Sequence, residues 1–220
     1  MEKQKVIDKI LEEKLIVIVR GVGSEALLPM AEAMYEGGIR ALEITFDASD
    51  PGRDAETAGN IKRLAEHFKD RMMIGAGTVL AAGQVERTKE AGGSFIISPN
   101  VNREVIQRTC ELDMVSIPGA LTATEAVEAH EMGADFVKLF PITNLGNGYV
   151  KAIKAPLSHI RFLGVGGIDE KNMGEYLKAG VCGFGIGSNI VDKRLIAAGD
   201  FAGIAKLARV YTDKGRVWDG

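Results

Sequence analysis

Short runs of Ile, Val, Leu and Phe alternate along the chain with longer stretches whose apolar residues recur every three to four positions. The short runs have the length and composition of β-strands, and the longer stretches have the spacing of amphipathic helices. Eight strands are predicted: Leu15–Val19, Ala41–Phe46, Met72–Gly77, Ser94–Ser98, Met114–Ile117, Asp135–Phe140, Ile160–Val165 and Cys182–Gly187. Helical spacing marks residues 24–38, 57–70, 84–93, 102–112, 122–134, 169–180 and 204–215.

This alternation of strands and helices predicts an α/β protein with an all-parallel sheet, and eight such units close into a (β/α)8 TIM barrel. An open doubly wound sheet is the alternative. It is disfavoured because the dinucleotide-binding glycine pattern is missing after the first strand, where the chain reads RGVGSEA. No linker or low-complexity tract divides the chain, so we expect one barrel domain over residues 1–220. A helix over Glu2–Lys14 precedes the first strand and is expected to cover the N-terminal end of the barrel.

Residues that favour helix ends flank several of the helical stretches. The predicted N-caps are Ser24, Asn102, Thr122 and Asp169, whose side-chain oxygens can accept from the first backbone N–H groups of a helix. The predicted left-handed C-caps are Gly37, Gly92, Gly133 and Gly180.

Composition and charge exclude several classes of function. The chain has 27 basic and 30 acidic side chains, a net charge of −3, so it lacks the basic surplus of a nucleic-acid-binding protein. No stretch approaches the roughly 20 apolar residues that span a bilayer. The first residues carry acids and do not resemble a signal peptide, and Cys110 and Cys182 are expected to be buried thiols. These features favour a soluble protein of a reducing compartment that binds neither nucleic acid nor membrane.

A carboxylate is predicted inside the barrel, from the strand Ala41–Phe46. Leu42, Ile44 and Phe46 share one face of this strand and are expected to pack against the helices, which turns Glu43 inward. A buried carboxylate is costly unless a charge or a hydrogen bond answers it. Glu43 is therefore either half of a structural ion pair or a catalytic group.

Lys138 is the charge that could answer Glu43. It shares a strand face with Phe136 and Phe140, so it is a poor candidate for a solvated surface residue. Burial lowers the pKa of a lysine, and the neutral amine attacks carbonyl groups to form a Schiff base. The alternative is a salt bridge with Glu43 or Asp135. Arg20 follows the first strand on the face of the inward residues, and the three charges together predict a catalytic site.

Glycines after the last two predicted strands indicate an anion site. Gly166 and Gly167 follow the seventh strand, and Gly187 and Ser188 lie where the eighth strand meets the next helical segment. Backbone N–H groups at these two positions form the phosphate site frequently found in TIM barrels. The alternative is that the glycines only permit tight turns.

No metal site is expected. His67, His130 and His159 have no ligand companions at suitable spacing, so all three are interpreted as structural or solvated. Thiol catalysis is not predicted either, because neither cysteine has an identifiable histidine partner. The sequence leaves open whether Trp218 packs on the barrel or at a subunit contact.

Motifs along nearly the whole chain resemble the class I KDPG/KHG aldolase family, which cleaves 2-keto-3-deoxy-6-phosphogluconate (KDPG) or 4-hydroxy-2-oxoglutarate (KHG) to release pyruvate. They are IVIVRG, LEIT, GAGTVL, ISPN, PGALTATE, FVKLFP, VGGI and GIGS. The resemblance implies that Lys138 is the Schiff-base lysine and that Glu43 moves protons through water. It implies further substrate contacts at Thr78 beside the pyruvate carboxylate, at Arg20, Gly166, Gly167 and Ser188 on the phosphate side, and at Pro99 and Pro118 in loops around the pocket. It also implies a cytoplasmic homotrimer that needs no metal or cofactor.

Two positions depart from the gluconate-type pattern. Asp47 stands where those members have an arginine that holds the substrate carboxylate, and Val165 stands where they commonly have threonine. Galactonate-type members resemble the chain more closely at both places. The leading interpretation is an aldolase for KDPG-type substrates or 4-hydroxy-2-oxoglutarate, with a 2-dehydro-3-deoxy-6-phosphogalactonate aldolase as the alternative. A sugar-phosphate isomerase or epimerase with Glu43 as base, and a non-catalytic phosphate sensor, represent other classes.

Overall fold

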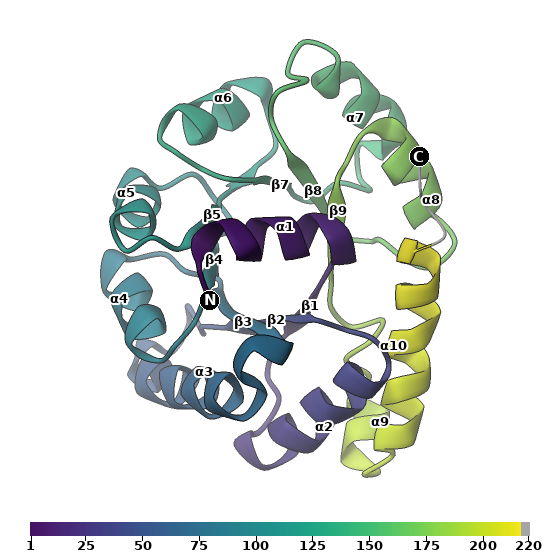
Figure 1. The fold of residues 1–220 in the computed structure, drawn as a ribbon. Coiled ribbons are helices and arrows are strands. Elements are labelled where there is room, and N and C mark those ends of the chain that lie inside the picture. The colour runs from purple at the N-terminus through teal and green to yellow at the C-terminus, as the bar shows by residue number, and fades with distance from the viewer. Residues whose placement is uncertain (217–220) are drawn as a thin grey trace.

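The computed structural model describes residues 1–216, which form a barrel of parallel strands surrounded by helices (Figure 1). The strands are β1 (Leu15–Val19), β2 (Ala41–Thr45), β3 (Met73–Gly77), β4 (Phe95–Ile97), β5 (Val115–Ile117), β6 (Gly119–Ala120), β7 (Val137–Leu139), β8 (Phe162–Val165) and β9 (Gly183–Ile186). The helices are α1 (Lys3–Glu13), α2 (Ser24–Glu36), α3 (Asp54–Phe68), α4 (Ala82–Glu90), α5 (Arg103–Glu111), α6 (Ala123–Glu131), α7 (Gly146–Lys154), α8 (Met173–Ala179), α9 (Lys193–Ala197) and α10 (Phe201–Arg216). Short 3-10 helices span Pro51–Arg53 and Lys69–Arg71.

The predicted (β/α)8 barrel is confirmed, and its fifth strand is divided in two. The strand order is β5-β4-β3-β2-β1-β9-β8-β7-β6, with every pair parallel. Its two ends, β5 and β6, are consecutive in the chain and are separated only by Pro118. Proline has no N–H to donate to a strand ladder, so it interrupts the strand there. The Pro118 carbonyl still accepts from Lys138 N at 2.8 Å, which joins this divided strand to β7.

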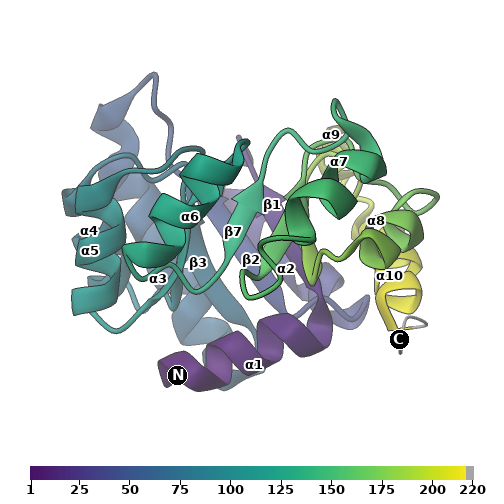
Figure 2. The same ribbon diagram turned by 90° about the horizontal axis from the view of Figure 1, so that it is seen from above.

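Helix α1 covers the N-terminal end of the barrel, as predicted (Figure 2). Its buried residues Val6, Ile7 and Ile10 join an inner apolar cluster with side chains of the barrel such as Phe95 and Phe136. Because this cluster fills the N-terminal half of the barrel, a binding site can form only at the C-terminal ends of the strands.

The strand faces alternate as the sequence predicts. Leu42, Ile44 and Phe46 belong to the large outer cluster between the strands and the surrounding helices. Glu43, on the opposite face of β2, points into the barrel and is only 1% exposed. A period of two along one strand is thus sufficient to place a carboxylate in the interior.

Two of the four predicted N-caps are confirmed. Asn102 accepts from the backbone N–H groups of Glu104 and Val105, and Thr122 forms a capping box with Glu125 at the start of α6. The other two predictions are wrong. Ser24 is already the first residue of α2, after Gly23. Asp169 caps the turn before α8 by accepting from the N–H groups of residues 171 and 172, both at 2.9 Å.

Three of the four predicted C-cap glycines have left-handed backbone conformations. Gly92, Gly133 and Gly180 have φ values of 82°, 102° and 111°. Gly37 is the exception, with φ −72°, because the chain turns at the next residue, Gly38, where φ is 97°.

Helices α7 and α9 are missing from the predicted stretches. The first turn of α7 contains two glycines, which are poor helix formers, and α9 is only five residues long. Trp218 lies outside the described residues. Both cysteines are free thiols, as expected, but each is only partly buried where a fully buried one was predicted. No helix within residues 1–216 has the length and apolar content to cross a membrane.

Candidate active site

A cavity of about 550 Å³ opens at the C-terminal ends of the strands. Nine of the ten predicted site residues line it: Arg20, Glu43, Thr78, Pro99, Lys138, Gly166, Gly167, Gly187 and Ser188. Glu43 lies on β2 and Lys138 on β7, and the others come from the segments that follow β1, β3, β4, β8 and β9. Pro118 is the exception. It is buried between β5 and β6 in the barrel wall and does not line the cavity.

Glu43 and Lys138 reach the cavity from opposite parts of the barrel wall, on β2 and β7. Lys138 is 7% exposed. Glu43 Oε2 is buried and has no hydrogen-bond partner within the described structure. Asp135, the other acid considered as a partner for Lys138, is occupied by Lys3 Nζ at 3.0 Å and by the N–H of Ser116 at 2.8 Å. Lys138 is therefore not held in an ion pair with Asp135, and one buried carboxylate oxygen of Glu43 is left without a protein partner.

Burial controls the ionisation of both groups. Desolvation lowers the pKa of Lys138, the carboxylate of Glu43 works against this, and the positive charge of Arg20 lowers the pKa further. Desolvation also raises the pKa of Glu43, although the charges of Lys138 and Arg20 oppose the rise. Each group thus tends toward its neutral form. A neutral amine is a nucleophile, and a carboxyl group with a raised pKa holds a proton more readily and can act as acid as well as base.

Lys138 is also held against an aromatic ring. Its Nζ lies 4.9 Å from the ring centroid of Phe140, which is 39% exposed at the edge of the cavity. This ring shields one side of the amine from water while leaving access from the cavity.

Arg20 and Thr78 contact one another at one end of the cavity. The guanidinium Nη2 of Arg20 donates to Thr78 Oγ1 at 2.8 Å. Thr78 follows β3 with a left-handed φ of 56°, a strained conformation for a β-branched residue. The resemblance places Arg20 on the phosphate side and Thr78 beside the carboxylate, but the structure brings the two functional groups together. This end of the cavity carries a cation and a hydroxyl side by side, a combination suited to a carboxylate.

The opposite end is formed by the two glycine-rich loops. Gly166 and Gly167 have φ values of 95° and 75°, which only glycine adopts readily. The next helix begins at Met173, so the glycine pair lies in a loop and not directly at a helix start as predicted. Asn189 Nδ2 donates to the carbonyl of Ile168 at 3.0 Å and joins the two loops. This end has backbone groups and the Ser188 hydroxyl on its surface.

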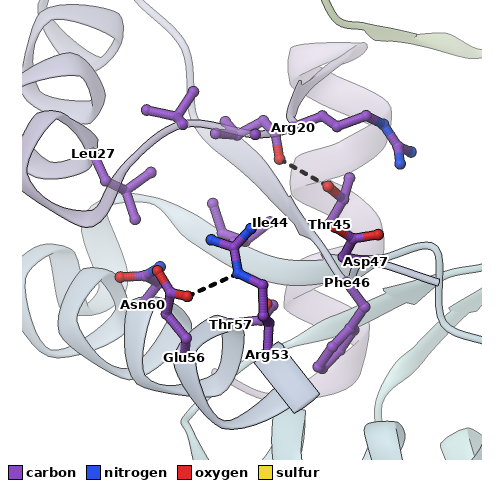
Figure 3. A pocket seen from close by; sticks show the side chains of 13 residues that line it. Arg20, Leu27, Ile44, Thr45, Phe46, Asp47, Arg53, Glu56, Thr57 and Asn60 are labelled. Atoms are coloured by element: carbon purple, nitrogen blue, oxygen red, sulfur yellow. Dashed lines mark hydrogen bonds and ion pairs between the residues drawn. The ribbon is translucent and has the colours of Figure 1, made fainter. Parts of the chain in front are cut away.

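Asp47 belongs to a different pocket. A cavity of about 160 Å³ lies between the end of β2, the loop after β1 and α3, on the outer side of the barrel wall (Figure 3). Asp47 lines it together with Arg53, whose Nε lies 3.0 Å from Glu56 Oε2. In Figure 3 the guanidinium of Arg20 points away from Arg53 and Glu56. The volume is small, Arg53 is paired with Glu56, and neither Glu43 nor Lys138 lines the pocket, so we assign no chemistry to it.

Some lining residues were not predicted as site residues. Phe140 was recognised only as a neighbour of Lys138, although its place on the same strand face was a usable signal. Asn189 carries no sequence signal beyond its position after Ser188. No group of three or more His, Cys, Asp or Glu side chains that could hold a metal ion occurs within residues 1–216.

Comparison with known proteins agrees with this geometry. The family model for KDPG and KHG aldolase matches residues 6–207. The chain belongs to the KDPG and KHG aldolase family. It is 38% identical over 191 residues to a probable 2-dehydro-3-deoxy-6-phosphogalactonate aldolase of Rhizobium meliloti (strain 1021), covering 86% of this chain and 87% of the relative. It is 37% identical over 177 residues to the 2-dehydro-3-deoxy-6-phosphogalactonate aldolase of Escherichia coli (strain K12), covering 80% and 83%.

A solved structure of another family member has the same fold. The KDPG aldolase of Legionella pneumophila, with pyruvate captured as a covalent carbinolamine intermediate, matches with a TM-score of 0.82 and 31% identity. The match covers 92% of this chain and 96% of that one. The family resemblance stated from the motifs is confirmed.

Proposed function

We propose that this family member is a Schiff-base aldolase that cleaves a 2-keto-3-deoxy-6-phospho sugar acid into pyruvate and an aldehyde phosphate. The observation that carries the proposal is the pair of buried groups in the barrel, Lys138 with a lowered pKa and Glu43 with a raised one. Both line a single cavity whose wall also contains Arg20 and the two glycine-rich loops. The pyruvate adduct named for the Legionella pneumophila relative supports the same chemistry.

In the proposed reaction, the neutral amine of Lys138 attacks the C2 ketone, and loss of water from the carbinolamine gives an iminium. Glu43, acting through a water molecule, takes the proton of the C4 hydroxyl. The C3–C4 bond breaks, its electron pair moves into the iminium to give an enamine, and the aldehyde phosphate leaves. Protonation of the enamine at C3 and hydrolysis of the iminium release pyruvate and restore Lys138.

The two ends of the cavity orient the substrate in this proposal. Arg20 and Thr78 bind the carboxylate next to C2. Arg20 thereby provides the positive charge that Asp47, an acid, cannot provide. The loops of Gly166, Gly167, Gly187 and Ser188 bind the distal phosphate through backbone N–H groups and a hydroxyl. Pro99 contributes to the wall between the two ends, whereas we propose no substrate contact for Pro118.

The galactonate-type substrate, the alternative from the sequence, is better supported than the gluconate-type one. Val165 lines the cavity and offers no hydrogen bond, in contrast to the threonine that the family resemblance gives to gluconate-type members. Two galactonate-type relatives are 38% and 37% identical. Steady-state rates on the two C4 epimers test this preference, and a higher kcat/KM on the gluconate epimer would contradict it.

Trapping with borohydride tests the aldolase mechanism. Pyruvate and borohydride should add a stable lactyl group to one peptide, the one that contains Lys138. Lys138→Ala and Lys138→Arg should give no adduct and no cleavage, because neither side chain offers a neutral amine. Glu43→Gln should still form the adduct and lose about 10²–10⁴-fold in cleavage rate. Substrate turnover without any adduct would instead favour an isomerase or epimerase, and ligand binding without turnover a sensor.

Assembly and location follow the same proposal. We expect a homotrimer in the cytoplasm, as the family resemblance implies. Light scattering on the purified protein measures the assembly, and a molar mass near the 23.6 kDa of a single chain would contradict it.

A further inference from the structure

A second cavity adjoins the glycine-rich end of the active site. It measures about 570 Å³ and shares Ile18, Arg20, Gly187 and Ser188 with the first cavity. Its remaining wall is formed by residues 191–194, which end the loop after β9 and begin α9. We call this space the side chamber. It is open to the same loops that the proposed function assigns to the distal phosphate.

Three cations and one acid line the side chamber, and two of the cations already have partners. The guanidinium of Arg20, which lines both cavities, donates to Thr78 Oγ1 at 2.8 Å. Arg194 Nη2 lies 2.8 Å from Asp192 Oδ2, and its Nε donates to Asp192 Oδ1 at 3.3 Å. Asp192 also accepts from the backbone N–H of Arg194, and these bonds lower the pKa of Asp192 to about 2. The acid of the chamber is thus fully ionised and is engaged by its own neighbour.

Lys193 supplies the remaining charge. Its ammonium nitrogen would lie 3.7 Å from a β-carbon at Gly21, so the side chain extends over the loop that follows β1. Within residues 1–216 this ammonium has no ion-pair or hydrogen-bond partner. A lysine that lines a cavity without a counter-charge attracts anions, and ammonium groups are common ligands of phosphate.

We propose that Lys193 is a substrate-binding residue that holds the distal phosphate at the entrance of the side chamber. This inference rests on the proposed function. The backbone groups of the two glycine-rich loops and the Ser188 hydroxyl hydrogen-bond to some phosphate oxygens, and Lys193 provides the positive charge that these neutral groups lack. Lys193 therefore determines how strongly a phosphorylated substrate is preferred over an unphosphorylated one.

Kinetics of Lys193→Ala and Lys193→Glu test this role. KM for the phosphorylated substrate should rise about 10-fold or more in Lys193→Ala, and further in Lys193→Glu, with kcat retained. KM for 4-hydroxy-2-oxoglutarate, which has no phosphate, should change much less. Lys171→Ala is the matched control, because Lys171 is exposed on the loop before α8 and lines neither cavity. Equal changes for both substrates, or no change in either variant, would overturn the proposal.

Two further measurements separate this proposal from the aldolase mechanism. Borohydride trapping with pyruvate, which has no distal group, should proceed at the wild-type rate in Lys193→Ala. If trapping fails in the wild type, the aldolase mechanism is wrong, and inorganic phosphate still tests the site. Phosphate should raise the melting temperature of the wild type and of Lys171→Ala but not of Lys193→Glu. Equal protection of all three proteins would exclude Lys193 as a phosphate ligand.

Discussion

Gly77 on β3 lies so close to the carboxylate of Glu43 on β2 that a β-carbon at residue 77 would be 1.6 Å from Glu43 Oε1. No L side chain fits there unless Glu43 moves. We therefore expect Gly77→Ala to displace the carboxylate, to lose most cleavage activity and to lower the free energy of unfolding by about 1–3 kcal/mol. Cleavage rates and urea denaturation measure both effects.

A double variant and a control isolate the contact. Glu43→Ala removes the atoms that collide with the new methyl group, so Gly77→Ala should cost much less stability in that background. Gly83→Ala, in α4 with open space around its added methyl group, should not reduce stability or activity. Additive losses in the double variant would show that the two residues do not compete for the same space.

The charges around Lys138 predict opposite shifts of its titration. Arg20 lowers the pKa of Lys138 and Glu43 raises it. Removing the like charge in Arg20→Ala should therefore raise this pKa and move the pH profile of adduct formation to higher pH. Removing the opposite charge in Glu43→Gln should move the profile to lower pH. Trapping at saturating pyruvate across the pH range gives both midpoints, and shifts of the same sign in both variants would contradict this electrostatic account.

The raised pKa of Glu43 also predicts how stability depends on pH. Between its unfolded value of 4.5 and its higher folded value, the folded state binds more protons than the unfolded state. The contribution of Glu43 to stability therefore falls as pH rises through this window. Glu43→Gln removes that loss, so its melting temperature relative to the wild type should increase from pH 4.5 upward and then level off. A constant difference at all pH values would show that Glu43 does not titrate in this way.

Asp47 should tolerate loss of its charge. Its Oδ1 accepts from Ser49 N at 3.0 Å and from Ser49 Oγ at 2.6 Å, so the carboxylate orders its own loop. An asparagine keeps this acceptor. Asp47→Asn should keep kcat/KM within about twofold and stability within about 0.5 kcal/mol. Inactivation of this variant would instead assign Asp47 a contact with the substrate.

The sequence predicts the barrel and most of the site for a simple physical reason. Strand periodicity determines which residues point inward, so Glu43 and Lys138 could be placed in the interior from their neighbours alone. Functional residues of a parallel barrel also follow the strands, which locates the glycine pairs. Thr78 is predicted only by the family resemblance.

The sequence could not show which conformations long side chains and loops adopt. The hydrogen bond from Arg20 to Thr78 depends on the rotamer of a flexible side chain and on the left-handed backbone of Thr78. The side chamber depends on the path of residues 188–192, for which no periodicity exists. The motif that contains Pro118 predicts it at the pocket. In the structure Pro118 is buried in the barrel wall, where it divides the fifth strand in two.

Replacing Thr78 by glycine should lower activity and raise stability. A non-glycine residue with φ near 56° stores of the order of 1–3 kcal/mol of strain. Thr78→Gly should relieve part of this strain, raise the melting temperature by about 2–4 °C and lose most activity, because Arg20 loses its hydroxyl partner. Thr78→Ser keeps the hydroxyl and should keep more activity. Asp113→Gly is the control: Asp113 is exposed after α5 with φ 52°, so it should gain stability and leave activity unchanged. A Thr78→Gly variant that retained full activity would remove Thr78 and its bond to Arg20 from the site.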